Sequence, residues 1–364
     1  MTGPPTYFEL ISGQRPGVAA SIARALLRPL SALYGVLVRT RNALYDYAGS
    51  PAWLDVPVIS VGNITVGGTG KTPMTLWVCR QLLKRGIRPA VLSRGYKTAA
   101  GRPPDELMVV ARRCPEAVGV AHPNRVAAGR LAVREYHVGA AVLDDGFQHR
   151  RLGRDLDLVL IDATCPFGYG HLLPRGLLRE PVDGLRRADA LVITRCDQVS
   201  PQERAALADR LRRLAPQAPI VACRHRPEGF CTLDGARHPG PRGRVGCFAG
   251  IARPDAFERT LADLGLAPAA IRWWPDHHDY VAGDLDLLDD WTVDEHLDML
   301  ITTEKDLVKL AGAGWQPRVP VVCLRVGIEM LDDGQAVLAG LIDRMLDNFN
   351  APAASRKDES HERT

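Results

Sequence analysis

Residues 62–72 are Gly62-Asn63-Ile64-Thr65-Val66-Gly67-Gly68-Thr69-Gly70-Lys71-Thr72. An apolar run at 56–61 precedes them and predicts a buried strand, and a helix is predicted at 73–85. In this strand–loop–helix context, glycines let successive backbone N–H groups converge on phosphate oxygens, and the helix N-terminus adds its positive end. The adjacent lysine and threonine complete the pattern of a phosphate-binding loop. The stretch therefore predicts a nucleotide-binding α/β fold.

The loop departs from the usual pattern at one position. A glycine is expected five residues before Gly70, and Thr65 stands there. The run at 67–72 is typical of the variant loop of kinases and of signal-recognition-type GTPases. We expect Lys71 to reach the β- and γ-phosphates and the Thr72 hydroxyl to bind Mg²⁺. The full set of predicted nucleotide ligands in the loop is Asn63, Thr65, Gly67, Gly68, Thr69, Gly70, Lys71 and Thr72. The alternative is a glycine-rich turn that binds no ligand.

Apolar runs and helical stretches alternate through residues 51–225. The runs are rich in Val, Ile and Leu without polar alternation, as in parallel strands that are covered on both faces. They lie at 56–61, 89–93, 140–143, 156–161, 190–194 and 220–223. The predicted helix at 201–214 opens with a capping box of Ser200 and Glu203. Residues 51–225 therefore predict a P-loop NTPase-like α/β domain with a mostly parallel sheet flanked by helices.

A stretch rich in Gly, Pro, Arg and His at 226–242 predicts a connection between domains. A second, smaller α/β domain is expected to follow it, up to residue 349, and to close over the site. Its predicted strands lie at 245–249, 271–274, 299–302 and 319–324, and its predicted helices lie at 257–264 and 335–345. The polar tail at 350–364 is predicted to be disordered.

The first 50 residues predict an amphipathic helix over 17–47. Four leucines recur on one face, namely Leu26, Leu30, Leu33 and Leu37. Three arginines fall on the opposite face, namely Arg24, Arg28 and Arg39. Pro29 is expected to kink or split the helix. The pattern favours a helix that lies in an anionic membrane interface. The alternative is a helix docked on the protein's own core.

Composition excludes few classes of protein. The 364 residues are 46% hydrophobic and 24% charged, as in a globular protein. A net charge of +4 does not argue for a nucleic-acid partner, and none is expected. The eight cysteines form no CxxC pair, which argues against a cysteine zinc site. No apolar run of about 18 residues predicts a spanning helix, and no cleavable signal pattern is found. We expect a monomer in a reducing compartment.

The predicted strand at 140–143 runs into Asp144-Asp145-Gly146-Phe147-Gln148-His149. Ligands of open α/β sheets bind at the carboxyl ends of the strands. Carboxylates at that position suit Mg²⁺, which prefers oxygen ligands. Asp144 or Asp145 is therefore predicted to hold the metal, directly or through water. The alternative is a solvated turn at the end of a strand.

Further motifs follow in order along the chain. They are Ser93-Arg94-Gly95-Tyr96, Asp105-Glu106, the run at 144–149, Leu178-Arg179-Glu180-Pro181, Phe248-Ala249-Gly250-Ile251, Pro275-Asp276-His277-His278 and Thr302-Thr303-Glu304-Lys305-Asp306. Together with the phosphate-binding loop, the chain resembles the tetraacyldisaccharide 4′-kinases over roughly residues 20–345. The resemblance implies Mg²⁺-dependent transfer of the γ-phosphate of ATP to the 4′-hydroxyl of a tetraacylated glucosamine disaccharide 1-phosphate, a lipid A precursor. It also implies a peripheral position at the cytoplasmic face of the inner membrane.

The resemblance implies roles for individual residues. Asp105 and His277 match a catalytic pair that activates the sugar hydroxyl. Asp144, Asp145 and Glu180 match acidic residues near the metal and phosphates, and Arg179 matches an arginine of the same site. A carboxylate–imidazole pair suits this chemistry because a sugar hydroxyl is a poor nucleophile at neutral pH. His277 is preferred over His278 because it directly follows Asp276.

Two other functions stay open. A signal-recognition-type GTPase would fit the variant loop and Thr194-Arg195-Cys196-Asp197, which resembles a guanine-reading Thr-Lys-x-Asp. However, Arg195 replaces the lysine, and that function gives no role to Asp105 or His277. A membrane-binding protein with a vestigial nucleotide site is the other alternative. The intact Lys71 and Thr72 argue against it.

Overall fold

The computed structural model describes residues 7–48, 50–95 and 103–351. Tyr96, and the predicted disordered tail from residue 352 on, lie outside these ranges. By their contacts the described residues form two compact units. The first holds Gly129–Arg224 with the described residues before Thr72 and after Glu329, and the second holds Thr72–Ala128 and His225–Glu329. The domain boundaries expected from the sequence stay a prediction.

The first unit is built on a parallel sheet in the order β7-β6-β5-β1-β4. The central strands are β1 (Val58–Asn63), β4 (Ala140–Asp144), β5 (Leu156–Asp162) and β6 (Ala190–Thr194). In the register of β1, Val61 lies opposite both Asp144 and Leu158. Every residue of these four strands is buried, which explains why the sequence shows no polar alternation. The predicted parallel α/β fold is confirmed.

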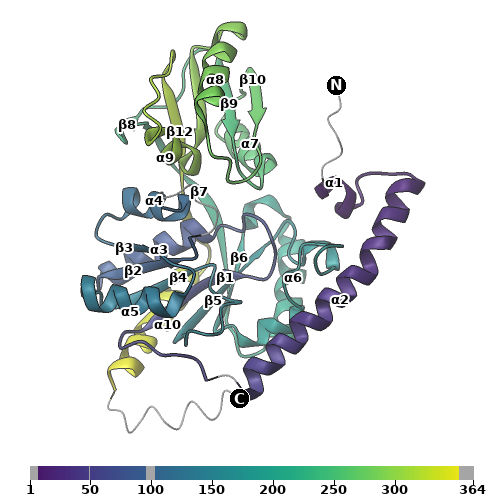
Figure 1. The fold of residues 1–364 in the computed structure, drawn as a ribbon, viewed down its shortest axis with the longest axis vertical. Helices are drawn as coiled ribbons and strands as arrows, with labels where there is room; N and C mark the ends of the chain where they lie inside the picture. Colours follow the sequence, from purple (N-terminus) through teal and green to yellow (C-terminus); the bar gives the residue numbers. More distant parts are fainter. Residues whose placement is uncertain (1–6, 49, 96–102, 352–364) are drawn as a thin grey trace. The chain divides into compact units, whose positions relative to one another are not determined.

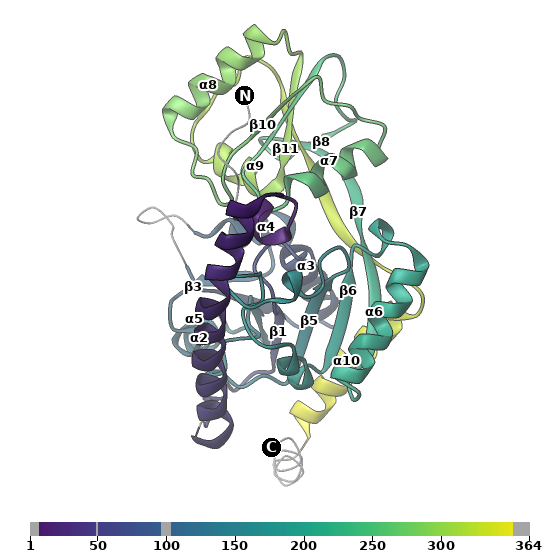
Figure 2. The same cartoon turned by 90° about the vertical axis from the view of Figure 1, so that its right-hand side faces the viewer.

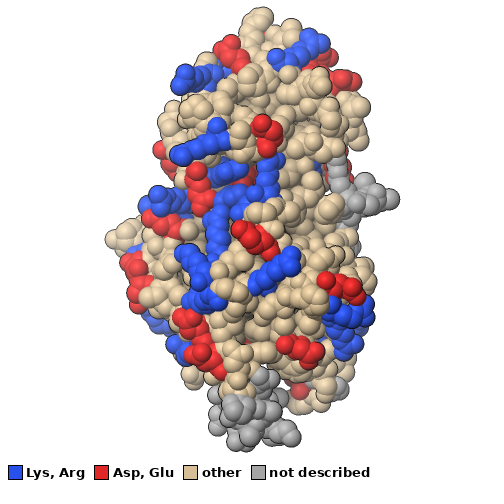
Figure 3. Space-filling model, turned by 90° about the vertical axis from the view of Figure 1, so that its left-hand side faces the viewer, with Lys and Arg blue, Asp and Glu red and all other residues tan. Residues whose placement is uncertain are grey.

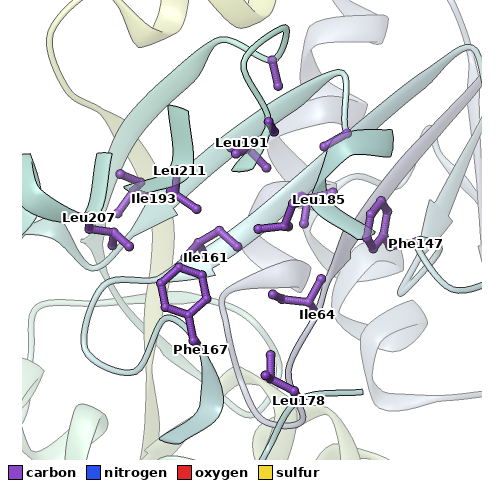
Figure 4. Packing of buried hydrophobic residues seen from close by; sticks show 14 of the residues in the cluster. Ile64, Phe147, Ile161, Phe167, Leu178, Leu185, Leu191, Ile193, Leu207 and Leu211 are labelled. Atoms are coloured by element: carbon purple, nitrogen blue, oxygen red, sulfur yellow. The ribbon is translucent and has the colours of Figure 1, made fainter. Parts of the chain in front are cut away.

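Apolar side chains pack on one another beside this sheet (Figure 4). Ile64 and Phe147 meet Leu185 of the short helix η2 (Val182–Arg187) and Leu211 of α6 (Pro201–Leu214) in one cluster. The predicted capping box of α6 is confirmed, because the Ser200 hydroxyl accepts from the N–H of Glu203 and the Glu203 carboxylate accepts from the N–H of Ser200. The same unit holds α1 (Tyr7–Ser12), η1 (Gly168–Gly170), η3 (Cys196–Gln198) and α10 (Gly334–Asn350).

The N-terminal helix α2 (Val18–Ala48) is a single helix (Figures 1 and 2). Of the two outcomes expected at Pro29, a split does not occur, because one helix continues through the proline, and a kink stays a prediction. Proline removes one backbone donor, which leaves the carbonyl of Ala25 without its helical partner. Ala25 and Pro29 are both exposed, so water can bond to that carbonyl. The helical turns on both sides of Pro29 therefore join into one continuous helix.

One face of α2 packs on the first unit, and it is not the leucine face. Ser31 Oγ donates to the carbonyl of Leu172 at 2.8 Å, and the Tyr34 hydroxyl donates to the carbonyl of Arg179 at 2.8 Å. The four leucines of the stripe are more than half exposed, namely Leu26, Leu30, Leu33 and Leu37. Their stripe is therefore not docked on the core. In length and composition, residues 18–47 also meet the requirement for a membrane-crossing helix, which the sequence analysis did not expect.

The second unit contains two groups of parallel strands. One is β2 (Pro89–Ser93) with β3 (Val118–Ala121). The other follows the order β10-β9-β11-β12, with β9 (Val245–Ala249), β10 (Ala270–Trp273), β11 (Met299–Thr303) and β12 (Val321–Met330). The remaining helices are α3 (Lys71–Leu83), α4 (Asp105–Arg113), α5 (Arg125–Tyr136), α7 (Pro254–Asp263), α8 (Ala282–Asp294) and α9 (Glu304–Ala311).

In this unit the connection predicted at 226–242 is corrected, and Asp105 is placed in a helix. The stretch at 226–242 is not only a connection, because β7 (Ile220–Thr232) continues into it and pairs with β8 (Arg237–His238). Cys231 is buried there, and its neighbours alternate between exposed and half-buried positions that a composition rich in Gly, Pro and Arg conceals. Asp105 begins α4 and is largely shielded from solvent.

Ion pairs are frequent in the second unit. Arg113 pairs with Glu304 at 2.7 Å and also contacts Glu228. Lys305 pairs with Glu106 at 2.6 Å, so helices α4 and α9 are joined by charges of both signs. Figure 3 shows basic and acidic side chains interleaved on one face of the molecule. Interleaved charges of this kind make small local fields and no single basic surface.

Gly62 is required by a close approach of two segments. A Cβ at this position would lie 2.6 Å from Phe147 Cβ and 2.7 Å from Phe147 N. We expect Gly62→Ala to lower the free energy of unfolding by roughly 1–3 kcal/mol, because the strand and the Phe147 backbone would have to separate. Urea denaturation of the two proteins measures the change.

Gly68→Ala is the matched control, because a Cβ there meets nothing within 4 Å. Its unfolding midpoint should stay close to that of the wild type. Equal stability of both variants would contradict the packing argument.

Candidate active site

The phosphate-binding loop connects β1 to α3. Gly67 and Gly70 have φ of 116° and 92°, a backbone conformation that favours glycine. Within the loop, Asn63 Nδ2 donates to Thr69 Oγ1 at 2.9 Å, and Lys71 Nζ lies 3.5 Å from Asn63 Oδ1. Asn63 is fully buried. The predicted ligand Asn63 thus shapes the loop from inside and also positions the lysine.

A neighbouring segment supports the outer side of the loop. Thr65 forms an isolated β-bridge with Leu178, and the N–H of Val66 donates to the carbonyl of Leu177 at 2.8 Å. The N–H of Arg179 donates to the carbonyl of Ile64 at 2.8 Å. The loop and the segment at 177–179 therefore form one structural element, and this explains how Arg179 reaches the site.

Two residues that the sequence analysis did not assign to the site hold the loop from the end of β6. Thr194 Oγ1 donates to the carbonyl of Thr69 at 3.1 Å. Arg195 donates to the carbonyl of Gly68 and pairs with Asp162. Arg195 is 5% exposed, so its guanidinium supports the loop and is not open to a nucleobase. Their place at the carboxyl end of a buried parallel strand is the signal that would have found them.

The acidic pair after β4 divides into two environments. Asp144 is the last residue of the strand and is 5% exposed. Asp145 lies 3.5 Å from Lys71 Nζ and accepts a hydrogen bond from Arg179 at 2.7 Å. Burial alone would raise the pKa of Asp145, but the charges of Lys71 and Arg179 outweigh it and hold that pKa well below its usual range. Asp145 is therefore ionised and keeps both cations beside the loop.

Glu180 is fully buried and is bonded on both oxygens. Its Oε1 accepts from Gln148 Nε2 at 2.8 Å, and its Oε2 accepts from Arg187 at 2.7 Å. Gln148 Nε2 also donates to the carbonyl of Asn63 at 2.8 Å. Glu180 thus links η2 to the base of the phosphate-binding loop. Gln148 was not predicted as a site residue, although it belongs to the motif at 144–149.

Thr72 follows Lys71 in the first turn of α3 and is 8% exposed. Among the described residues, no group of three or more His, Cys, Asp or Glu side chains gathers as in a protein-only metal site. Mg²⁺ does not need such a cluster, because it is usually bound by one or two carboxylates together with substrate phosphates. The hydroxyl and carboxylate oxygens at hand are hard ligands of the kind that this ion prefers.

In the second unit, Asp105 and His277 meet although 172 positions separate them. His277 Nδ1 lies 3.2 Å from Asp105 Oδ2. The hydrogen bond to Asp105 raises the pKa of His277, although burial and the charge of Lys305 act against it. Burial opposes ionisation of Asp105, but the His277 hydrogen bond and Lys309 lower its pKa. His277 has a φ of 59°, a conformation that residues with a side chain rarely adopt and that is often found at functional sites.

Lys309 fixes the other side of Asp105. It is 1% exposed, lies 3.4 Å from Asp105 Oδ2 and 3.3 Å from Asp306 Oδ1, and donates to the carbonyl of His278 at 2.8 Å. Asp306 is itself fully buried and accepts from the Tyr280 hydroxyl at 3.1 Å. The sequence analysis missed Lys309, because a lysine in a short helix resembles a solvated residue.

The neighbours of the pair have different partners. His278 Nε2 lies 2.9 Å from Asp284 Oδ2, and its ring stacks on Trp274. His278 therefore belongs to the packing around the start of α8, and His277 is the histidine that faces Asp105. Glu106 is held by Lys305 and lies 4.0 Å from His277 Nε2.

Because the hydrogen bond to Asp105 raises the pKa of His277, we expect this imidazole to titrate above the usual range of a histidine. Asp105→Asn should move its pKa downward, since an amide cannot stabilise the imidazolium as a carboxylate does. Nuclear magnetic resonance titration of the histidine ring protons measures both values. An unchanged His277 titration in Asp105→Asn would contradict the pairing.

Comparison with known proteins identifies the family of the chain. Residues 23–346 match the family described as Tetraacyldisaccharide-1-P 4′-kinase. The tetraacyldisaccharide 4′-kinase of Anaeromyxobacter dehalogenans (strain 2CP-C) is 40% identical over 356 residues, which cover 90% of this chain and 92% of that protein. The one of Geobacter sulfurreducens is 38% identical over 364 residues, which cover 93% of this chain and 98% of that protein.

A solved structure extends the match to three dimensions. The structure of LpxK from Aquifex aeolicus in complex with ATP superposes with a TM-score of 0.71 at 31% identity, and covers 89% of this chain and 99% of that one. Sequence and fold thus agree over most of the length. The chain belongs to the tetraacyldisaccharide 4′-kinase family.

Proposed function

We propose that this chain transfers the γ-phosphate of ATP to the 4′-hydroxyl of a tetraacylated glucosamine disaccharide 1-phosphate. Family membership supports the reaction. The observation that carries the assignment of residues is the contact of 3.2 Å between His277 and Asp105. The two come from distant parts of the sequence, at the two positions where the resemblance implies a catalytic pair.

On the donor side, the loop amides at 63–72 bind the phosphates, and Lys71 and Arg179 supply positive charge. Asp145 keeps these two cations in place through the contacts described above. Thr72 and Asp144 would hold Mg²⁺, with Asp145 and Glu180 in the surrounding shell, since both oxygens of Glu180 already accept hydrogen bonds. Bound with the nucleotide, the ion would neutralise charge on the β- and γ-phosphates.

On the acceptor side, His277 takes the proton of the 4′-hydroxyl as the bond to phosphorus forms. Asp105 stabilises the imidazolium that results, and Lys309 keeps Asp105 ionised and oriented. Both substrates must reach one another with these groups aligned, and such alignment contributes much of the acceleration in phosphoryl transfer.

The GTPase alternative has less support. Arg195, which would have to read the guanine, is buried against Gly68 and Asp162. The comparisons match a kinase family over most of the chain. The alternative of a vestigial nucleotide site does not explain the contacts of Asp145 with Lys71 and Arg179, which hold two cations beside the loop.

We also propose that α2 lies in the interface of the inner membrane on its cytoplasmic side, as a peripheral contact. Its leucine stripe is exposed, and a different face is held on the protein through Ser31 and Tyr34. A helix with one apolar and one protein-bound face suits a position along the membrane surface. A lipid substrate would then meet the enzyme without leaving the bilayer.

Asp105→Ala and His277→Ala should each lower kcat by roughly 10²–10⁴-fold, the usual contribution of general-base catalysis. In the wild type, kcat/KM should rise with pH through the raised pKa of His277, because the base must be neutral, and Asp105→Asn should move that inflection to lower pH. Transfer of labelled phosphate from ATP to the disaccharide lipid, with and without Mg²⁺, measures these rates.

His278→Gln is the matched control. It should retain kcat near that of the wild type and lose only thermal stability, because its contacts are with Asp284 and Trp274. Equal turnover of GTP and ATP, or full activity of both Ala variants, would reject the proposed reaction or the pair, respectively.

Replacing the four stripe leucines of α2 with Gln should weaken sedimentation with lipid vesicles at least about tenfold. Each leucine that enters the interface contributes up to roughly 1.5–3 kcal/mol, and Gln keeps a similar helix propensity. A control with Ala25→Gln and Ala32→Gln changes exposed positions of the same helix outside the stripe and should bind as the wild type does. Equal binding of the leucine variant would place the membrane contact elsewhere.

A further inference from the structure

Three arginines from two segments of the first unit gather beside the N-terminal end of α2. Arg24 Nη1 lies 3.4 Å from the carbonyl of Leu10 and donates to the carbonyl of Arg15 at 3.1 Å. Arg175 Nη1 donates to the carbonyl of Ile11 at 2.9 Å. Two guanidiniums therefore meet the last turn of α1 at successive carbonyls. Arg28 follows Arg24 by one helical turn and projects on the same side.

The charges of this arginine cluster (Arg24, Arg28 and Arg175) repel one another. Burial, followed by the charges of Arg24 and Arg28, lowers the pKa of Arg175. Burial, followed by the charges of Arg175 and Arg28, also lowers the pKa of His171, on the same loop as Arg175. Like charges brought together in this way disfavour the charged forms. An anion between them would remove that repulsion.

Within the described part of the chain, no carboxylate forms a salt bridge with any arginine of the cluster. The acidic residue of α1, Glu9, is exposed, and the next acidic residue along the chain, Asp46, pairs with Arg150. The Nε atom of Arg175 is buried and has no hydrogen-bond partner in the described structure. Apart from a hydrogen bond of 3.1 Å from Arg24 Nη2 to Ser21 Oγ, the cluster offers donors and positive charge that the described side chains do not use.

The chemistry of the surroundings indicates the ligand. Arginine forks match the oxygen geometry of phosphate groups. On the same part of α2, Ile22, Leu26 and Leu30 are 55%, 66% and 52% exposed. A helix with a cationic cluster on one face and an exposed apolar stripe on the other has the polarity profile of a membrane interface, with phosphate groups above acyl chains.

We propose that Arg24, Arg28 and Arg175, with His171 beside them, bind the phosphate group of a membrane lipid. The site deepens the proposed function, on whose membrane contact it rests. The ligand is a lipid-borne phosphate, supplied either by an anionic phospholipid or by the 1-phosphate of the acceptor. The loop that carries Arg175 continues into the segment that supports the phosphate-binding loop, through the bridge of Leu172 with Leu178. A lipid held here keeps the membrane surface next to the nucleotide site.

The first test compares vesicle binding of the full chain and its variants. Vesicles of phosphatidylcholine, with and without phosphatidylglycerol, are sedimented with wild type, Arg175→Gln, Arg24→Gln and the charge-matched control Arg39→Gln. Loss of one arginine near an anionic surface weakens binding about fivefold by charge alone. A phosphate site predicts a clearly larger loss for Arg175→Gln and Arg24→Gln than for Arg39→Gln, and only on the anionic vesicles.

The second test identifies the source of the phosphate. In neutral detergent micelles, a KM for the 1-phosphorylated acceptor that rises in Arg175→Gln, but not in Arg39→Gln, assigns the site to the acceptor. A loss confined to anionic vesicles assigns it to a phospholipid. Equal losses in all three variants, with no change of KM, mean diffuse surface charge and overturn the site.

Folding and activity are controlled separately. Because the cluster repels itself, Arg175→Gln should melt at the same temperature as the wild type or a higher one. Phosphate transfer by the wild type in neutral micelles tests the kinase activity alone. If that transfer fails, the proposed reaction fails while the vesicle comparison still decides the lipid site.

Discussion

The ammonium group of Lys309 is the constraint on which the acceptor side depends. At 1% exposure it has lost its water, and an unpaired buried charge costs several kcal/mol. Two carboxylates, Asp105 and Asp306, and the carbonyl of His278 replace that water. If either carboxylate were removed, the ammonium group of Lys309 would lose part of the negative charge that replaces its water. The need to stabilise this buried charge therefore fixes the position of Asp105. Asp105 in turn orients the side chain of His277, which is half exposed.

The donor side is organised by the backbone, with side chains as supports. Gly67 and Gly70 permit the turn, and Thr194 and Arg195 hold it by donating to the carbonyls of Thr69 and Gly68. Asp145 resembles His277 in one respect. Both residues adopt a left-handed φ, of 55° and 59°, and both present a titratable group at a turn. Strain of this kind is tolerated where neighbouring contacts define the conformation, as the cation contacts of Asp145 do.

Long, strongly patterned elements were predictable from the sequence, and irregular ones were not. The strands at 89–93, 190–194 and 245–249 and the helix at 201–214 agree with the structure to the residue. They are set by local runs of apolar residues or by a capping box. The continuation of β7 and the start of α4 at Asp105 depend on partners far along the chain. Lys309 and the arginine cluster escape prediction for the same reason, since burial or crowding of a charge is a tertiary property.

Helix α2 contacts the protein on one face and exposes apolar side chains on another, and its sequence alone does not distinguish these faces. Its hydropathy is sufficient for a spanning helix, yet a spanning helix needs lipid or protein on every side. Here a narrow strip fits closely on the protein, since a Cβ at Gly35 would lie 2.8 Å from Leu172 Cδ1. The leucine stripe has no such partner within the described residues. A helix bound on one face and apolar on the other can bury both only by lying flat at the interface. In the position proposed for α2, the hydrogen bond from Tyr34 to the backbone of Arg179 would also set the depth of the nucleotide site relative to the lipid head groups.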